Sequence, residues 1–118
     1  MYGLPVGTDV SFLMESSLVQ VCIGENETIL NMHPRISIMI ASVVRVIPPG
    51  GAESAFEDSR QLGTALLPVL GSSVTDVSIV PPGTLRLTWS SGYVIEIIDS
   101  WKEFESYTVT NADRTIVV

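Results

Sequence analysis

Two stretches of this chain resemble each other, and this weak internal repeat constrains the fold more than any single residue does. The first, residues 7–32, contains the alternating run Val19–Ile23, a polar break and a second apolar run. The second, residues 71–98, has the same order around the alternating run Leu85–Trp89. Alternating runs separated by glycine and polar residues are typical of β-hairpins. We therefore predict two related three-stranded units that share one core, lined by Val19, Val21 and Ile23 from one unit and by Leu85, Leu87 and Trp89 from the other.

The length and composition fit one domain with a substantial core. The chain has 118 residues, of which 46% are hydrophobic, and a domain of this length buries roughly two thirds of the surface that its unfolded chain exposes. Most of the apolar residues are Val, Ile and Leu in short runs, which favours buried strands. We expect a single domain over residues 1–118, with a sheet that is covered on both faces or partly covered by a partner.

The remaining signals place further strands and one short helix. Ile36–Ile47 is the longest apolar run and is interpreted as one central strand. Beyond the breaker Pro48-Pro49-Gly50-Gly51, only Ala52–Leu70 has helical periodicity, which Gly63 and Pro68 restrict to a short helix or an irregular crossover. Further strands are expected at Val10–Met14, Leu18–Ile23, Thr28–Met32, Ser73–Val80, Thr84–Ser90, Tyr93–Ile98, Tyr107–Asn111 and Thr115–Val118, with one helical turn at Trp101–Glu105. The predicted fold class is α+β, mostly antiparallel β, as a bent sheet or small open barrel with one short helix.

A glycine marks one turn of the second unit. Ser91-Gly92 lies between two alternating runs, and glycine adopts a positive φ without steric cost. We therefore predict a tight hairpin turn in which Gly92 has a positive φ.

The charge of the chain excludes some partners and favours others. Thirteen acidic and six basic residues give a net charge of −7, so phosphate backbones and anionic lipid surfaces are repelled. The run Ile36–Ile47 contains Arg45 and is shorter than the roughly 20 residues of a membrane span. We expect no nucleic acid and no membrane among the partners, and a basic protein as the electrostatically favoured one. The oligomeric state is left open, a homodimer included.

The chain has one cysteine and one histidine, which limits redox and metal chemistry. Cys22 has no partner for an intramolecular disulfide, which fits a reducing cytoplasm, and its strand position favours a buried small residue. His33 would need carboxylates such as Glu25 and Glu27 across a hairpin to form a zinc site, and a turn histidine is the favoured interpretation. Met1–Gly7 lacks the features of a signal peptide. We expect a cytoplasmic protein without a metal.

No catalytic or cofactor motif is recognisable. The paired serines, such as Ser72-Ser73, occupy turn positions and lack the G-x-S-x-G pattern of serine hydrolases. Pro48-Pro49-Gly50-Gly51 lacks the lysine of a phosphate-binding loop and the spaced glycines of a dinucleotide site. We therefore predict no catalytic residues and no cofactor.

The densest polar and aromatic cluster lies at residues 99–107. It allows three interpretations: aromatic residues that plug one end of the sheet, aromatic anchors of a protein interface ringed by charge, or a pair of catalytic carboxylates. A structural role is favoured over an interface, and an interface over catalysis. If the protein has a dedicated partner, the residues predicted to bind it are Trp101, Glu103, Glu105 and Tyr107.

Several segments near the C-terminus follow a recurring pattern. They are Leu85-Arg86-Leu87-Thr88-Trp89-Ser90-Ser91-Gly92, then Asp99, then Phe104-Glu105-Ser106-Tyr107-Thr108-Val109, and a terminal apolar strand. This pattern resembles that of a family of small uncharacterised bacterial proteins with L-x-L-x-F-x-N-G and Y-E-S-[YFW]-x-I motifs, from which the chain departs at Trp89, Ser91 and Phe104. The resemblance extends from the Gly71 lead-in to the C-terminus and implies no particular activity. Some members of that family are similar to immunity proteins of bacterial toxin systems.

These observations predict a non-enzymatic cytoplasmic binding protein that docks on a basic partner, of which a toxin-neutralising immunity protein is the concrete case. The alternative is a small-molecule or sugar-binding β-barrel whose mouth is lined by Trp89, Trp101 and Tyr107. An enzyme that uses carboxylates comes third. A binding surface for a protein would show exposed acids around exposed aromatic rings, whereas a ligand barrel would show aromatic rings that point into a deep pocket.

Overall fold

The structure is a computed structural model that describes residues 9–81, 83–98, 106–111 and 114–118. These residues form ten strands, one α-helix and two short 3-10 helices. The strands are β1 (Ser17–Ile23), β2 (Thr28–His33), β3 (Ile36–Ile40), β4 (Val44–Ile47), β5 (Ser54–Phe56), β6 (Val74–Val80), β7 (Thr84–Trp89), β8 (Val94–Ile97), β9 (Tyr107–Asn111) and β10 (Arg114–Val117). The helices are η1 (Ser11–Leu13), α1 (Ser59–Leu66) and η2 (Leu67–Val69).

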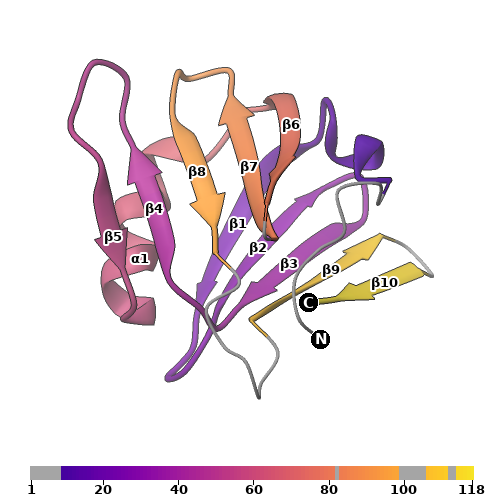
Figure 1. Cartoon of the computed structure of the whole chain (residues 1–118), viewed down its shortest axis with the longest axis horizontal. Coiled ribbons are helices and arrows are strands. Elements are labelled where there is room, and N and C mark those ends of the chain that lie inside the picture. Colours follow the sequence, from indigo (N-terminus) through magenta and orange to yellow (C-terminus); the bar gives the residue numbers. More distant parts are fainter. Residues whose placement is uncertain (1–8, 82, 99–105, 112–113) are drawn as a thin grey trace.

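The strands form two antiparallel sheets that pack face to face. Sheet A has the order β1-β2-β3-β9-β10, and sheet B has the order β5-β4-β8-β7-β6. Figure 1 shows sheet B in front of sheet A, with α1 on the side where β5 lies. The prediction of a mostly antiparallel α+β fold with one short helix is confirmed for the described residues. The strands are divided between two stacked sheets, which do not close into a barrel.

The core lies between the two sheets, because alternate side chains of each strand point inward. Leu30 and Ile38 of sheet A and Leu87 and Ile95 of sheet B have no exposed surface. Trp89 and Tyr107 are the largest fully buried side chains. Burial of each such side chain contributes about 1.5–3 kcal/mol, so this shared core holds the two sheets together.

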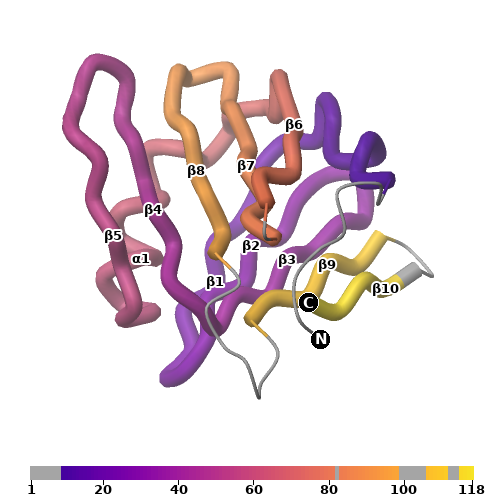
Figure 2. Tube along the Cα trace, viewed as in Figure 1, coloured from indigo at the N-terminus to yellow at the C-terminus, as the bar shows by residue number. Residues whose placement is uncertain are grey.

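The strand order repeats along the chain. Strands β1 to β3 lie in sheet A and continue into β4 and β5 of sheet B, whereas β6 to β8 lie in sheet B and continue into β9 and β10 of sheet A. Figure 2 shows the first of these crossings, where the trace leaves β3 and enters β4. Each half of the chain therefore contributes a pair of strands to the sheet that the other half begins.

Hydrogen bonds where the two halves meet also repeat. The Leu18 amide donates to the Ser72 carbonyl at 3.0 Å, and the Val74 amide donates to the Ser16 carbonyl at 2.8 Å. Glu15 and Gly71, which precede these segments, both have a positive φ, at 67° and 86°. Leu18 therefore has the same position in the first half of the chain as Val74 has in the second half, and β1 is the counterpart of β6.

The predicted pairing of Val19–Ile23 with Leu85–Trp89 is wrong, because those residues belong to β1 and β7. Val19 is 59% exposed and Ile23 is 48% exposed, whereas Leu85, Leu87 and Trp89 are buried. The cause is a β-bulge, which interrupts the register of β1 between Leu18 and Gln20 and thereby ends the simple alternation at Val19. Strand β6 has a bulge at the corresponding place, between Val74 and Asp76.

Two other expected strands differ from the structure. The run Ile36–Ile47 is divided into β3 and β4, which lie in different sheets. Each strand is buried on one face only, since Met39 and Arg45 point away from the core. Residues Val10–Met14 contain η1 instead of a strand, because Asp9 accepts hydrogen bonds from the amide and the hydroxyl of Ser11 and so favours a turn.

The predicted turn at Gly92 is confirmed. Gly92 has a φ of 93°, and its amide donates to the Trp89 carbonyl at 2.9 Å. A Cβ atom at this position would also lie 2.9 Å from Cβ of Pro49.

We expect Gly92→Val to lower the free energy of unfolding by about 1–3 kcal/mol, because a β-branched residue is strained at a positive φ. Urea denaturation measures the change. Ser91→Val, at the neighbouring exposed position, is the control and should change stability by less than about 0.5 kcal/mol. Equal effects of the two substitutions would contradict the special role of Gly92.

Candidate functional site

The partner-binding cluster expected from the sequence lies mostly outside the described residues, which include neither Trp101, Glu103 nor Glu105. Tyr107 is described and lies in β9, with only 1% of its surface exposed. Its hydroxyl donates to the Gly83 carbonyl at 2.9 Å. Tyr107 thus belongs to the core, which differs from the expectation of an exposed aromatic anchor, because the inward face of β9 places its ring between the sheets.

The alternative site, the mouth of a barrel, does not form around the described residues that were expected to line it. Trp89 is 1% exposed and packs in the core beside β6 and β8. Tyr107 is buried as well, and the sheets stay open. The aromatic residues that remain partly accessible are elsewhere, and two of them, Phe56 and Tyr93, lie at one cleft.

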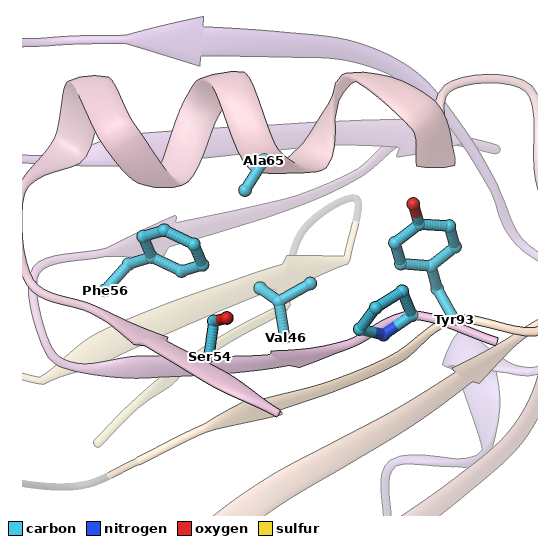
Figure 3. Close-up of a pocket in the computed structure, with 6 residues that line it drawn as sticks. Val46, Ser54, Phe56, Ala65 and Tyr93 are labelled. Carbon is cyan, nitrogen blue, oxygen red and sulfur yellow. The ribbon is translucent and has the colours of Figure 1, made fainter. Parts of the chain in front are cut away.

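This cleft lies between α1 and the inner face of sheet B. It has a volume of about 180 Å³ and is lined by Val46, Pro48, Ser54, Phe56, Ala65 and Tyr93. Figure 3 shows the strand residues along one wall, with Ala65 of α1 on the opposite wall. We call it the α1–β5 cleft.

Strand pairing places the residues of the sheet wall. Ser54 and Phe56 of β5 lie opposite Val46 and Val44 of β4, so all four share the inner face. Tyr93 precedes β8, and its carbonyl accepts a hydrogen bond from the Trp89 amide at 2.9 Å, which fixes its backbone in the β7–β8 hairpin. The wall is therefore built on regular strands.

Helix α1 forms the other wall because it is anchored at its first residues and along its buried side. Asp58 caps the helix by accepting a hydrogen bond from the Arg60 amide at 3.1 Å. The Ser59 hydroxyl bonds to the Gly24 carbonyl in the β1–β2 hairpin. Gly63 lies against Ile23 of β1, since a Cβ atom there would be 2.4 Å from that side chain. The helix is thus held against sheet A and faces the cleft with Ala65.

The lining of the cleft is apolar and carries no charge, but it contains two hydroxyl groups. The hydroxyls of Ser54 and Tyr93 have no hydrogen bond to any part of the chain that the structure describes. A wider, more open groove of about 430 Å³ continues from Phe56 and Ala65 along Arg60, Gln61 and Thr64. Such a surface can hold an apolar group and offer it a hydrogen bond.

Exposed acidic residues flank the cleft-lining residues in the chain. Glu53 precedes β5, and Glu57 and Asp58 connect β5 to α1. Glu25 lies in the β1–β2 hairpin, where its carbonyl accepts a hydrogen bond from the Ser59 hydroxyl at 3.3 Å. Arg60 lies beside Asp58, at 3.9 Å between Nη1 and Oδ1, with both side chains largely in solvent. We call Glu25, Glu53, Glu57 and Asp58 the acidic rim.

His33 does not lie near Glu25 and Glu27, the carboxylates with which it could have formed a zinc site. Glu25 and Glu27 precede β2, whereas His33 ends it, so they are separated by roughly 20 Å of extended strand. Among the residues placed by the structure, no group of three or more histidine, cysteine or acidic side chains is arranged to hold a metal ion.

A second charged cluster lies on the outer face of sheet B. Glu96 is 5% exposed and lies between Arg45 and Arg86 on the neighbouring strands. Its carboxylate is 3.1 Å from Nε of Arg45 and accepts a hydrogen bond from Nε of Arg86 at 2.7 Å. The Glu96 carboxylate lies within ion-pair distance of both guanidinium groups across the strands, so we interpret this cluster as structural.

Sequence reasoning missed the α1–β5 cleft, although one signal for it was present. Phe56 lies among Glu53, Glu57 and Asp58, which is the same mixture of aromatic and acidic residues that drew attention to residues 99–107. The helical periodicity of Ala52–Leu70 obscures this signal, because it predicts a helix at Phe56. Phe56 is instead in β5, whose inward face points it at the cleft.

Comparison of the chain with protein-family models, curated proteins and solved structures finds no match. The resemblance of the C-terminal part to small bacterial proteins therefore stays a prediction. None of the helices in the described ranges has the length and apolar character needed to cross a bilayer.

Proposed function

We propose that this protein is a non-enzymatic cytoplasmic binding protein whose α1–β5 cleft takes an apolar side chain from a basic segment of a partner protein. The observation that carries the proposal is the combination of an uncharged, apolar cleft with exposed acidic residues on the segments that form it or hold its helix in place. An apolar anchor flanked by basic residues matches both features. A toxin-neutralising immunity protein is the concrete case, because it would act by docking on a basic partner.

The size of the cleft supports a single anchor. Its volume of about 180 Å³ is close to that of an engineered protein cavity of about 150 Å³ that binds benzene. One phenyl or isobutyl group therefore fits within it. Burial of one such group contributes about 1.5–3 kcal/mol, which is enough to decide the position at which a segment binds.

The charges of the rim support a basic partner. Glu25, Glu53, Glu57 and Asp58 are exposed. The described cations near them are Arg60, which lies beside Asp58, and Arg45, which lies opposite Ala55 and is 3.1 Å from Glu96. Exposed charges act mainly on the rate of association and on the choice of partner, and salt weakens them. Binding should therefore be favoured for positively charged segments and should decrease as salt is added.

A small neutral ligand is the second candidate. The hydroxyls of Ser54 and Tyr93 are the observation that favours it, since both lie at the cleft without a hydrogen bond to the described chain. A ligand with an apolar ring and a polar substituent would satisfy them. Salt would leave its affinity unchanged, which separates it from a basic segment.

Calorimetric titration with short synthetic peptides tests the proposal. The probe has one central phenylalanine between lysines, and its two controls replace either the phenylalanine by serine or the lysines by glutamates. We expect the serine peptide to bind about tenfold more weakly or worse, because the anchor is lost, and the glutamate peptide to show no binding. Equal affinity of all three peptides would contradict the proposal.

We expect Phe56→Ala to weaken binding of the lysine probe about tenfold, because it removes the aromatic wall of the cleft. Phe12→Ala is the matched control, since Phe12 is also half-buried against the core but lies at η1. Circular dichroism confirms that both variants are folded under the conditions of titration. If both variants lose affinity equally, the α1–β5 cleft is not the binding site.

A further inference from the structure

Strand β5 forms a free edge of sheet B, next to the α1–β5 cleft. Figure 1 shows it at the left end of the sheet, with α1 behind it. The strand at the other end, β6, is partly covered, since the Val74 amide donates to the Ser16 carbonyl before β1. Among the described segments, only β4 forms backbone hydrogen bonds with residues 53–57. The edge of β5 is therefore open to a further strand.

Strand register shows which backbone groups point to this edge. The Ile98 amide donates to the Val43 carbonyl, and hydrogen-bonded pairs alternate along antiparallel strands. The backbone groups of Val44 and Val46 therefore bond to β5 and not to β8. They lie opposite the last and first residues of β5. The middle residue, Ala55, is exposed and has its N–H and C=O turned to the free edge.

A groove runs beside β5 on the side of α1. It has a volume of about 430 Å³ and is lined by Phe56 of β5 and by Arg60, Gln61, Thr64 and Ala65 of α1. The α1–β5 cleft also touches β4, whereas this groove touches only β5 and α1, so it lies further out. A strand added next to β5 would place its inward side chains there, because alternate side chains of neighbouring strands share one face of a sheet.

The charges that flank β5 favour a basic strand over a second copy of this chain. Glu53 and Glu57 are exposed and stand directly before and after β5. Two copies of β5 paired antiparallel about Ala55 would bring Glu53 of each copy opposite Glu57 of the other, and like charges in such pairs are destabilising. Basic residues at the same two places would form ion pairs. Arg45 would be separated from the added strand by β5 and is 3.1 Å from Glu96.

We propose that the partner segment binds as a sixth strand of sheet B, antiparallel to β5. This inference rests on the function proposed above and adds the conformation in which the basic segment is recognised. One residue of the segment exchanges both backbone hydrogen bonds with Ala55. Antiparallel pairing is the slightly more stable arrangement, and it continues the pairing of the neighbouring strands.

This register determines the pattern of the segment. The residue after the one bonded to Ala55 lies opposite Ser54 and carries the apolar anchor, since the small Ser54 side chain leaves the cleft accessible. The residue before the bonded one lies opposite Phe56 and points into the groove. Basic residues two positions before and two positions after lie opposite Glu57 and Glu53.

Calorimetric titration with two N-methylated forms of the lysine probe tests the backbone pairing. N-methylation of the lysine before the phenylalanine removes the N–H that bonds to the Ala55 carbonyl, so we expect binding to weaken about tenfold or more. N-methylation of the phenylalanine is the control, because its N–H points away from β5, and affinity should stay within about threefold. Equal effects of the two N-methyl groups would overturn strand addition but leave the cleft as the anchor site. Failure of the unmodified probe to bind would overturn the proposed function and this inference with it.

Ala55→Pro tests the same pairing from the side of the protein. Proline removes the N–H of residue 55 and is tolerated on edge strands where that N–H faces solvent. We expect the variant to fold, as circular dichroism can verify, and to bind the lysine probe about tenfold more weakly or worse. Ala55→Val keeps the N–H and should bind like the unmodified protein. Normal affinity of a folded Ala55→Pro variant would overturn strand addition.

Amide hydrogen exchange in the unmodified protein needs no substitution. The Ala55 amide should exchange more slowly once the lysine probe saturates the protein, because its N–H then donates to the added strand. The Thr75 amide, on β6 at the other end of sheet B, is the reference and should keep its rate. An unchanged rate at Ala55 with the probe bound would overturn strand addition, even if the phenylalanine occupies the cleft.

Discussion

Replacing Tyr107 by alanine is expected to lower the free energy of unfolding by about 4 kcal/mol. The ring of Tyr107 is among the largest fully buried side chains of the core, and its hydroxyl is bonded to the Gly83 carbonyl in the β6–β7 hairpin. The substitution leaves a cavity between the sheets and removes the hydrogen bond that ties β9 to that hairpin. Chemical denaturation followed by tryptophan fluorescence measures the change.

Tyr107→Phe separates the two contributions. It keeps the ring and removes only the hydroxyl, so we expect a loss of about 1–2 kcal/mol. A small effect of Tyr107→Ala, close to that of an exposed substitution, would contradict the core position of Tyr107. It would instead favour the surface role that the sequence assigns to this residue only if the protein has a dedicated partner.

Replacing Glu96 by alanine is expected to lower the free energy of unfolding by about 2 kcal/mol. Removal of one partner from a buried ion pair costs about 3–5 kcal/mol, and we reduce this value because Arg45 and Arg86 are 38% and 45% exposed. Without the carboxylate, two guanidinium groups are left on neighbouring strands with no anion between them. Thermal or urea unfolding at low salt measures the loss.

Two further variants test whether the loss of stability in Glu96→Ala has a cause other than the lost ion pairs. Glu96→Gln keeps the shape of the side chain and an oxygen acceptor, so its effect should lie between those of the unmodified chain and Glu96→Ala. Asp76→Ala removes an exposed acid from β6 of the same sheet and should change stability by less than about 0.5 kcal/mol. If Asp76→Ala costs as much as Glu96→Ala, the stabilisation comes from overall charge and not from the cluster.

The sequence predicted the strands well where alternation and turn residues agreed. Tyr107–Asn111 has the same bounds as β9, and the turn at Gly92 has the predicted positive φ. Prediction from the sequence failed where contacts between distant segments decide where a strand begins, bends or ends. The run Ile36–Ile47 has no internal breaker, so nothing local indicates that the chain crosses from sheet A to sheet B at Ala41–Val43. The bulge at Val19 is equally invisible, since it depends on the register with β2.

The candidate site was harder to predict, because its parts are distant in the sequence. Tyr93, Phe56 and Ala65 meet only after β4 pairs with both β5 and β8. Helix α1 closes the cleft because Ser59 bonds to the β1–β2 hairpin, which is another contact between distant segments. Composition singles out interleaved aromatic and acidic residues, but it does not tell which such cluster lies beside a cleft.

Chemical-shift mapping tests the proposed binding cleft most directly. The amide spectrum of the ¹⁵N-labelled protein is recorded as the lysine probe with its central phenylalanine is added, with the serine peptide as the reference. We predict that the largest differences between the two titrations occur at Phe56, Ala65 and Tyr93, and that the rim residue Glu57 shifts with both peptides. Differences centred on β6 and β7, or on the outer face of sheet A, with none at the α1–β5 cleft, would contradict the proposed function.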